Sequence, residues 1–304
     1  MIGRLLLALG TLLTAMWLVG FICADRWYWS QWLLWMTGLS LIPAGGFLLW
    51  GHWCLQRRLR GYPMLLMLLG VGVWVSGLLG FQVRMSDGQV ASIRILQWAA
   101  GPVIGTPEPY ASFIVETDAD ISIVHGGHRA ATTEAYRSWA ADRQVAIRGA
   151  FLIASRIPIY QLQTLIWAND ITLVLLELHP PEAAPIRMIL TDLPSDPLRS
   201  RAAIATRVQE ALAAHGDPVN IMLGDFNMTQ DSWQLRHLAA DLQPMWSLCG
   251  DGWGGTFPRR WPVVQLDHVL SSPERVISMH TITPPVGRHR AMVTQYVLQS
   301  ADEH

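Results

Sequence analysis

The sequence predicts a layered α/β domain that follows three transmembrane helices. Three uncharged apolar runs lie within the first 86 residues of this 304-residue chain, and each is long enough to cross about 30 Å of hydrocarbon. After residue 86, short apolar runs alternate with helix-like stretches, as in domains whose sheets are covered by helices. We therefore divide the chain into a membrane anchor, residues 1–86, and a second domain, residues 87–304.

The apolar runs end at charged or aromatic residues, as membrane spans do. Pro43 and Gly45 interrupt the second run, which membrane helices tolerate. The expected spans are Leu5–Ala24, Trp32–Leu55 and Pro63–Phe81.

Two alternatives to three retained helices are open. The stretch Cys23-Ala24-Asp25 resembles a weak cleavage site, so the first run could belong to a signal peptide. A second apolar run follows at once, which favours a retained helix. The runs could also be buried helices of a soluble protein, although three uncharged runs in tandem rarely share one core.

Arginines indicate the orientation of the spans. Arg57, Arg58 and Arg60 lie between the second and third runs, and Arg4 precedes the first. Because positive residues concentrate in cytoplasmic loops, both segments are expected inside. Three crossings then carry the chain out. We expect a multi-pass protein of the inner or cytoplasmic membrane, with its C-terminal domain outside the cytoplasm.

Charge is divided unevenly between the two parts. Residues 1–86 carry six Arg against one acid, Asp25, whereas the remainder carries 16 Arg against 22 acids. An acidic domain is a poor general binder of nucleic acid, because that affinity depends on cations that neutralise phosphates. The chain has no Lys, which excludes P-loop and Schiff-base lysine chemistry. Only Cys249 lies in the second domain, so this domain holds no internal disulfide.

The second domain reads as alternating strands and helices. The run Ile171–Leu178 is almost continuously apolar, as in a strand covered on both faces. The other expected strands are Ile93–Trp98, Ile121–Val124, Phe151–Ala154, Asn220–Leu223, Val263–Leu270 and Ala291–Leu298. The expected helices are Pro107–Thr117, Thr133–Arg143 and Pro197–His215, the last with a cap at Ser195-Asp196.

The clearest chemical motif is Gly224-Asp225-Phe226-Asn227, directly after an expected strand. Side chains at the end of a strand project into the crevice where α/β sheets bind ligands. There, Asp225 can accept a proton and Asn227 can donate to an anionic oxygen. A turn built from Gly, Asp and Asn is the alternative interpretation.

Three further positions carry histidines or their partners. Asp267 could orient His289 by fixing the tautomer of its ring, and the alternative for His289 is a solvated loop histidine. His179 closes the strand Ile171–Leu178, where a structural role is the alternative.

Taken in order, these residues resemble the endonuclease/exonuclease/phosphatase superfamily, whose fold is that of deoxyribonuclease I. Bacterial members with three N-terminal membrane helices have a similar arrangement. The resemblance covers residues 92–300 and depends on six motifs: Leu152–Ile159, His179-Pro180-Pro181, GDFN at 224–227, GGTFP at 254–258, QLDHVL at 265–270, and His289.

The resemblance implies a four-layered α/β sandwich of two mixed sheets flanked by helices. It also implies metal-dependent hydrolysis of a phosphoester, usually with Mg²⁺ or Mn²⁺ as the cofactor. Asp225 would then activate water, and Asn227 would bind phosphate. Asp267 would orient His289, which contacts a phosphate oxygen, and His179 would be a second contact.

Three positions depart from the family pattern on the side that holds the metal. Ala99 stands where the family has Asn, Gly126 where it has the metal-binding Glu, and Arg288 where it has Asp. His125 is a candidate substitute ligand, and an imidazole favours Zn²⁺ or Mn²⁺ over Mg²⁺. Arg288 could instead bind phosphate directly, since its planar fork suits phosphate oxygens.

Two functions therefore stay open. The first is a membrane-anchored phosphodiesterase or phosphomonoesterase with a degraded metal site and weak activity. The second is a non-catalytic relative that binds a phosphorylated ligand or a protein partner. A phosphorylated small molecule or a phospholipid headgroup is the expected ligand.

Overall fold

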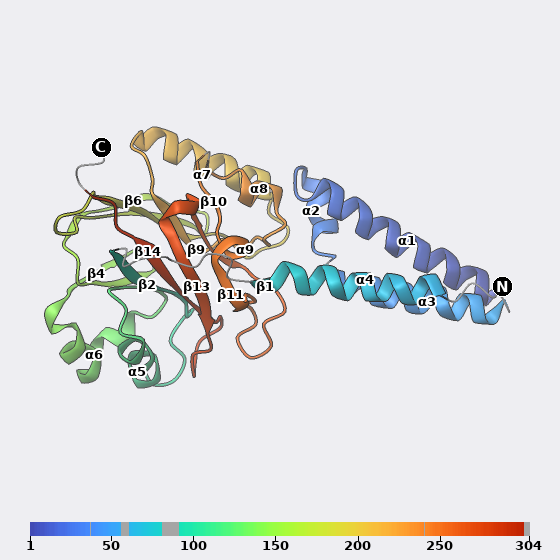
Figure 1. Cartoon of the computed structure of the whole chain (residues 1–304), viewed down its shortest axis with the longest axis horizontal. Coiled ribbons are helices and arrows are strands. Elements are labelled where there is room, and N and C mark those ends of the chain that lie inside the picture. The colour runs from blue at the N-terminus through green and yellow to red at the C-terminus, as the bar shows by residue number, and fades with distance from the viewer. Residues whose placement is uncertain (37, 56–60, 81–90, 240, 301–304) are drawn as a thin grey trace. The chain divides into compact units, whose positions relative to one another are not determined.

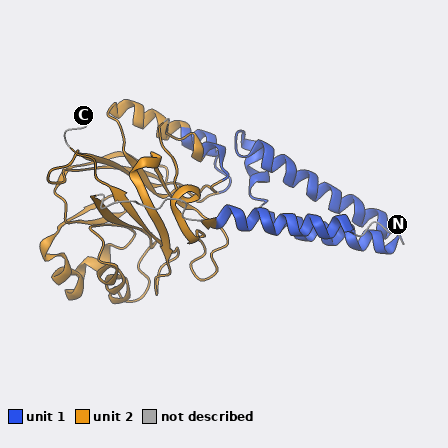
Figure 2. Cartoon of the chain, in the orientation of Figure 1, with its two compact units in different colours: residues 1–78, 197–205, 231–234 blue, residues 79–196, 206–230, 235–304 orange. Residues whose placement is uncertain are grey.

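The structure, a computed structural model, describes residues 1–36, 38–55, 61–80, 91–239 and 241–300 and divides into two compact units (Figure 2). Unit 1 comprises Met1–Leu78 together with Pro197–Ala205 and Asp231–Gln234, and unit 2 comprises the rest. The division after Leu78 lies near the expected boundary at residue 86. That boundary and the arginines at 57, 58, 60 and 84 lie outside the described residues.

Unit 1 contains a bundle of apolar helices (Figure 1). Helices α1 and α4 are each long and apolar enough to cross a membrane. Helix α2 and the following η1–α3 segment meet at a bend of 69°. They provide a third candidate span only if the two segments together count as a single broken span. The bounds are α1 Ile2–Cys23, α2 Tyr28–Leu34, η1 Gly38–Ser40, α3 Leu41–Cys54 and α4 Gly61–Leu78.

The second apolar run is interrupted earlier than the sequence predicts. The break follows Leu34, whereas Pro43 and Gly45 both lie within α3. Pro43 is tolerated there because it stands in the first turn of the helix, whose N–H groups have no intrahelical partner.

Small residues bring the helices of unit 1 close together. A Cβ at Gly10 of α1 would lie 2.8 Å from the carbonyl oxygen of Ala44 in α3. A Cβ at Gly70 of α4 would overlap the backbone of Gly38. Close backbone approach at glycine is typical of helices that pack in a membrane.

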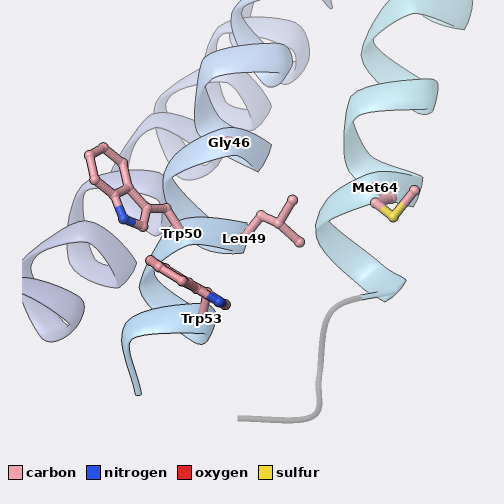
Figure 3. A pocket seen from close by; sticks show the side chains of 5 residues that line it. All are labelled: Gly46, Leu49, Trp50, Trp53 and Met64. Atoms are coloured by element: carbon pink, nitrogen blue, oxygen red, sulfur yellow. The ribbon is translucent and has the colours of Figure 1, made fainter. Parts of the chain in front are cut away.

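Helices α3 and α4 border an apolar groove of about 490 Å³ (Figure 3). It is lined by Gly46, Leu49, Trp50, Trp53 and Met64. None of these five side chains carries a titratable group, so they offer no acid or base to the groove.

The stretch Pro197–Ala205 of unit 1 is held by a polar side chain of α2. The Gln31 side chain donates to the carbonyl oxygens of Pro197 and Arg199, at 3.1 Å each, and accepts from the backbone N–H of Arg201. Helix α7, Arg201–His215, therefore begins four residues later than the sequence predicts. The Ser200 hydroxyl, which accepts from Ala203 N–H, is near its start, in place of the expected cap at Ser195-Asp196.

Unit 2 is built from two mixed sheets flanked by helices, as predicted. The eight-stranded sheet has the order β1-β11-β13-β14-β2-β3-β5-β4, and the six-stranded sheet has the order β10-β12-β9-β8-β7-β6. The strands of the first are β1 Leu79–Gly80, β2 Ser92–Ala99, β3 Ile121–His125, β4 Gln144–Arg148, β5 Phe151–Ser155, β11 Gly250–Trp253, β13 Val276–Ile282 and β14 Ala291–Val297. The strands of the second are β6 Ile159–Ala168, β7 Ile171–Leu178, β8 Ile186–Asp192, β9 Ile221–Asp225, β10 Gln243–Pro244 and β12 Asp267–Ser271.

All seven predicted strands are present, but the one expected from Val263 begins only at Asp267. Strands β1, β4, β6, β8, β10, β11 and β13 were not predicted. The remaining helices are α5 Glu108–Thr117, η2 His128–Thr132, α6 Glu134–Trp139, η3 Ala140–Asp142, α8 Trp233–Arg236, α9 Trp246–Cys249 and η4 Pro273–Arg275.

Two apolar layers hold unit 2 together. The first contains Ile95, Ile123, Leu176 and Leu223, which come from both sheets, so it is the core between them. The second contains alternate residues of the eight-stranded sheet, such as Leu96, with residues of α5 and α6. Side chains that face the first layer but lie at the ends of their strands define the site described next.

Candidate functional site

Three aspartates form a row at one edge of the six-stranded sheet. Asp192 pairs with Asp225 across the parallel strands β8 and β9, and Asp225 pairs with Asp267 across the antiparallel strands β9 and β12. Residues paired in register project from the same face of a sheet, on strands about 4.8 Å apart. Asp225 and Asp267 are buried. We call Asp192, Asp225 and Asp267 the aspartate row.

His289 faces two members of the aspartate row. Its Nδ1 lies 2.7 Å from an Asp267 carboxylate oxygen, and its Nε2 lies 3.8 Å from Asp225 Oδ2. The Nδ1 contact is a hydrogen bond, whereas 3.8 Å is too long for one. Although burial disfavours the charged ring, Asp267 and then Asp225 raise the pKa of His289 to about 9. His289 is therefore an imidazolium at neutral pH, as the proposed Asp267–His289 pair requires.

Asp225 is crowded by like charge. Its burial and then the charge of Asp267 raise the pKa of the Asp225 carboxyl to about 7, with a further contribution from Asp192. A carboxyl in this range can take up a proton near neutral pH.

Asn227 fixes the turn that follows β9. Its backbone has a φ of 50°, in the left-handed region that Asn tolerates. The Asn227 N–H donates to Asp225 Oδ1 at 3.1 Å, and its side-chain amide donates to the Leu193 carbonyl at 2.8 Å. Asn227 thus orients Asp225 and joins the turns after β8 and β9.

A second histidine reaches the row from the opposite sheet. His125, the last residue of β3, places Nε2 3.1 Å from Asp192 Oδ2. Although burial opposes it, the bond to Asp192 raises the pKa of His125. The row therefore has an Asp–His pair at each end. The sequence analysis named His125 but missed Asp192, whose only signal was an acid at the end of the apolar stretch Ile186–Leu190.

His179 lies elsewhere, and this corrects the expectation that it would be a second phosphate contact. Strand β7 runs antiparallel to β8, so its last residue, Leu178, pairs with Ile186, whereas Thr172 pairs with Asp192. Six residues of strand span about 20 Å. At the opposite end of the sheet, His179 Nε2 bonds Glu177 at 2.8 Å.

The turn at Ala100-Gly101 lies among Ala99, Gly126 and Arg288, the three positions expected to depart from the family pattern. Gly126 has a φ of 79°, and a Cβ there would overlap the carbonyl of Gly101. Arg288 N–H donates to the Ala100 carbonyl, and its side chain lies against Gly101. The turn after Ala99 thus takes up the space beside Gly126, and the Arg288 side chain is exposed.

The residues present include suitable ligands for a divalent cation. Asp225, Asp267 and His289 each offer a ligand atom, and these atoms lie within 4.8 Å of one another. Within the described residues, Asp267 Oδ1 is buried and has no hydrogen-bond partner. His125 and Asp192 offer a second nitrogen–oxygen pair. Carboxylates suit Mg²⁺ and Mn²⁺, and imidazole suits transition metals.

Comparison with solved structures finds the same fold in bacterial proteins. The endonuclease/exonuclease/phosphatase family protein of Bacteroides thetaiotaomicron has a TM-score of 0.54 and 15% identity, over 69% of this chain and 99% of its own. The endonuclease/exonuclease/phosphatase of Beutenbergia cavernae has a TM-score of 0.52 and 14% identity, over 69% of this chain and 72% of its own. A comparison with curated protein sequences found no match.

The sequence itself gives the family. Residues 86–289, about two thirds of the chain, match the Endonuclease/Exonuclease/phosphatase family, and they span the aspartate row and both histidines that face it. The chain therefore belongs to the endonuclease/exonuclease/phosphatase family.

Proposed function

We propose that this chain is a membrane-anchored phosphoesterase that hydrolyses a phosphoester at the aspartate row. The observation that supports it is the buried pair formed by the Asp267 and His289 side chains, which lies beside Asp225. Crowded carboxylates destabilise a fold, and strongly perturbed acids and bases gather at functional sites.

Each side chain has a role in this proposal. Asp225 accepts the proton of the attacking water, and the Asn227 N–H holds the carboxylate in place. His289, kept charged by Asp267, directs Nε2 toward Asp225 without bonding it. A phosphate oxygen could therefore accept a hydrogen bond from this nitrogen, which stabilises charge that develops on the phosphate.

A divalent cation is the proposed cofactor. Asp225 and Asp267 would hold it, joined by His289 only where that ring is neutral, or His125 would hold it with Asp192. When bound, it would polarise the phosphate and stabilise the leaving oxygen.

Hydrolysis of bis(4-nitrophenyl) phosphate by the purified full-length chain in detergent tests the proposal, with Mg²⁺ or Mn²⁺ supplied. We expect turnover that falls at least about 100-fold in Asp225→Asn, because removing a positioned base costs 10²–10⁴-fold. The exposed Asp251→Asn is the control and should keep full activity. No turnover with either cation would reject the proposal.

A non-catalytic role is the second candidate, and the turn at Gly101 supports it. This turn stands in the place of the family's Glu side chain, and Arg288 adds a cation beside it. In this case the site binds a phosphorylated ligand or a protein partner without hydrolysis. Inorganic phosphate should then raise the Tm without turnover. Arg288→Ala should remove that effect, whereas the exposed Arg260→Ala should not.

The membrane topology and the substrate are also proposals. Three crossings, with the bent α2–α3 pair as the second, would place the family domain outside the cytoplasm. A phosphorylated small molecule or a phospholipid headgroup suits an acidic domain next to a bilayer better than nucleic acid does. A reporter fused after residue 304 that works only in the cytoplasm would reject the topology.

A further inference from the structure

Gln97 is a buried side chain with no role in the proposed hydrolysis. It is 3% exposed, and among the described residues neither its Oε1 nor its Nε2 has a hydrogen-bond partner. A buried polar group without a partner destabilises the folded chain. A bound ion is one of the explanations for such a group.

Gln97 lines the same small cavity as Asp225, the proposed base. A small cavity between the two sheets is lined by Gln97, Ala99, His125, Phe151, Gly224 and Asp225. Gln97 and Ala99 are two residues apart on β2 and therefore share a face. Ala99 replaces the family's Asn and has no ligand atom, whereas Gln97 brings a carboxamide to the cavity from one step deeper on the same strand.

His125 lines this cavity, and its Nε2 faces Asp192 at the spacing of neighbouring ligands. Their Nε2 and Oδ2 atoms are 3.1 Å apart. Two ligands at right angles around an ion, each about 2.1 Å from it, lie about 3 Å apart. Asp192 is also the strand neighbour of Asp225, so the pair lies beside the proposed base.

We propose that Gln97 Oε1, His125 Nε2 and a carboxylate oxygen of Asp192 bind a first-row transition metal ion, such as Mn²⁺ or Zn²⁺, in preference to Mg²⁺. The proposal rests on the proposed function, since it names the cofactor of that site and its ligands. One nitrogen and two oxygens make a mixed donor set, and imidazole suits transition metals better than it suits Mg²⁺. The site replaces the positions lost at Ala99, Gly126 and Arg288 with residues from β2, β3 and β8. With the metal ion at this site, His289 and its partner Asp267 are free of the ion, and His289 can contact the phosphate.

Metal affinity tests this assignment independently of turnover. The full-length chain in detergent is treated with a chelator and titrated calorimetrically with Mn²⁺, Zn²⁺ and Mg²⁺. We expect Mn²⁺ and Zn²⁺ to bind at least about 10-fold more tightly than Mg²⁺. His125→Gln and Gln97→Leu should each weaken Mn²⁺ by at least about 10-fold, whereas the exposed Gln243→Leu should not.

One further measurement distinguishes the loss of a metal ligand from misfolding. A second distinguishes metal binding at His125 from metal binding at His289. Gln97→Leu removes two unpartnered polar atoms, so its Tm without metal should equal or exceed that of the wild type. Pulsed electron paramagnetic resonance of bound Mn²⁺ should detect an imidazole nitrogen that disappears in His125→Gln and persists in His289→Gln.

The outcomes for the metal and for the function are distinct. Equal affinity for Mg²⁺, no binding of any of the three ions, or a nitrogen signal that depends on His289 would overturn the metal assignment, even if the chain hydrolyses phosphoesters. Binding as described without hydrolysis would support the metal assignment and reject the proposed function.

Discussion

Asp192 and Asp225 are paired in register on adjacent parallel strands, so two carboxylates lie side by side at the end of the six-stranded sheet. Like charges at paired positions destabilise a sheet, and the third carboxylate, Asp267, is paired to the other side of Asp225. The arrangement is compensated by His125 at one end of the row and His289 at the other. Asp225, in the middle, has no hydrogen-bonded histidine among the described contacts. Repulsion from its two neighbouring carboxylates therefore acts most strongly on this residue.

The first prediction concerns this central carboxylate. The pKa of the Asp225 carboxyl is raised to about 7, so at pH 8 its buried negative charge destabilises the folded chain. Asp225→Asn removes this charge, and at pH 8 the variant should unfold at a higher temperature than the wild type. A gain of about 1 kcal/mol corresponds to about 2–4 °C in Tm for a domain of this size. Differential scanning calorimetry in the presence of a chelator measures it.

This effect disappears at low pH. A raised carboxyl pKa means that the folded chain holds its proton more tightly than the unfolded chain, so the penalty is absent below pH 4 and complete above pH 7. The stabilisation by Asp225→Asn should therefore vanish near pH 4. An equal Tm for both proteins at pH 8 would show that the row is not strained.

The second prediction concerns His289. Its pKa is raised to about 9, so it contributes stability that is fully present below pH 6.5 and is lost as the pH rises through 9. The Tm of the wild type should fall over this interval. Asp267→Asn removes the main cause of the shift, and its Tm should change less between pH 6.5 and 9.

Calorimetry of both proteins across this range checks the prediction. The exposed His237→Gln is the control. It should show the same fall in Tm between pH 6.5 and 9 as the wild type. A fall of the same size in Asp267→Asn would mean that another group is responsible.

The third prediction compares two glycines with nearly the same backbone. Gly126 has a φ of 79° and Gly105 a φ of 80°, but a Cβ at Gly126 would overlap the Gly101 carbonyl, whereas Gly105 has open space. Left-handed backbone at a residue other than glycine costs about 1 kcal/mol or more. Gly105→Ala should show this cost alone, and Gly126→Ala should lose at least about 1 kcal/mol more.

Denaturant unfolding of both variants gives the difference directly. The comparison also bears on the family's lost Glu: Gly126→Glu should be at least as destabilised as Gly126→Ala and should not restore tight Mg²⁺ binding. Two equally stable alanine variants would mean that the turn at Gly101 moves aside at little cost.

The sequence predicted those parts of the site that lie in local motifs. Asp225 and Asn227 follow a strand within a four-residue motif, and Asp267 begins another, so their place at the end of the sheet follows from short-range pattern. Asp192 was missed because its strand, β8, lies between Pro185 and Pro194 and was not predicted. Its role depends on register with Asp225, which no local pattern contains.

The direction of a strand was the other limit. His179 ends the most apolar strand of the chain, and the ends of parallel strands gather at one edge of a sheet. Strand β7 is antiparallel to β8, so this end lies on the far edge. Similarly, the sequence predicts departures from the family pattern at Ala99, Gly126 and Arg288, but it contains no sign that Gly101 packs against two of these positions.

The last prediction concerns Asp25, the only acid in the first 86 residues. It is 2% exposed, and its carboxylate accepts from the Ser232 hydroxyl at 2.5 Å and from the backbone N–H groups of Trp233 and Gln234 at 2.7 and 3.2 Å. These groups stand at the start of α8, where the helix N–H groups have no intrahelical partner.

Asp25→Ala should lower the free energy of unfolding by about 2 kcal/mol, because three hydrogen bonds to a charged acceptor are lost and their donors stay buried. The exposed Asp251→Ala should cost less than about 0.5 kcal/mol. Limited proteolysis in detergent should cut the Asp25→Ala chain near residues 231–234 faster than the wild type, and equal cutting rates would mean that this stretch is held by other contacts.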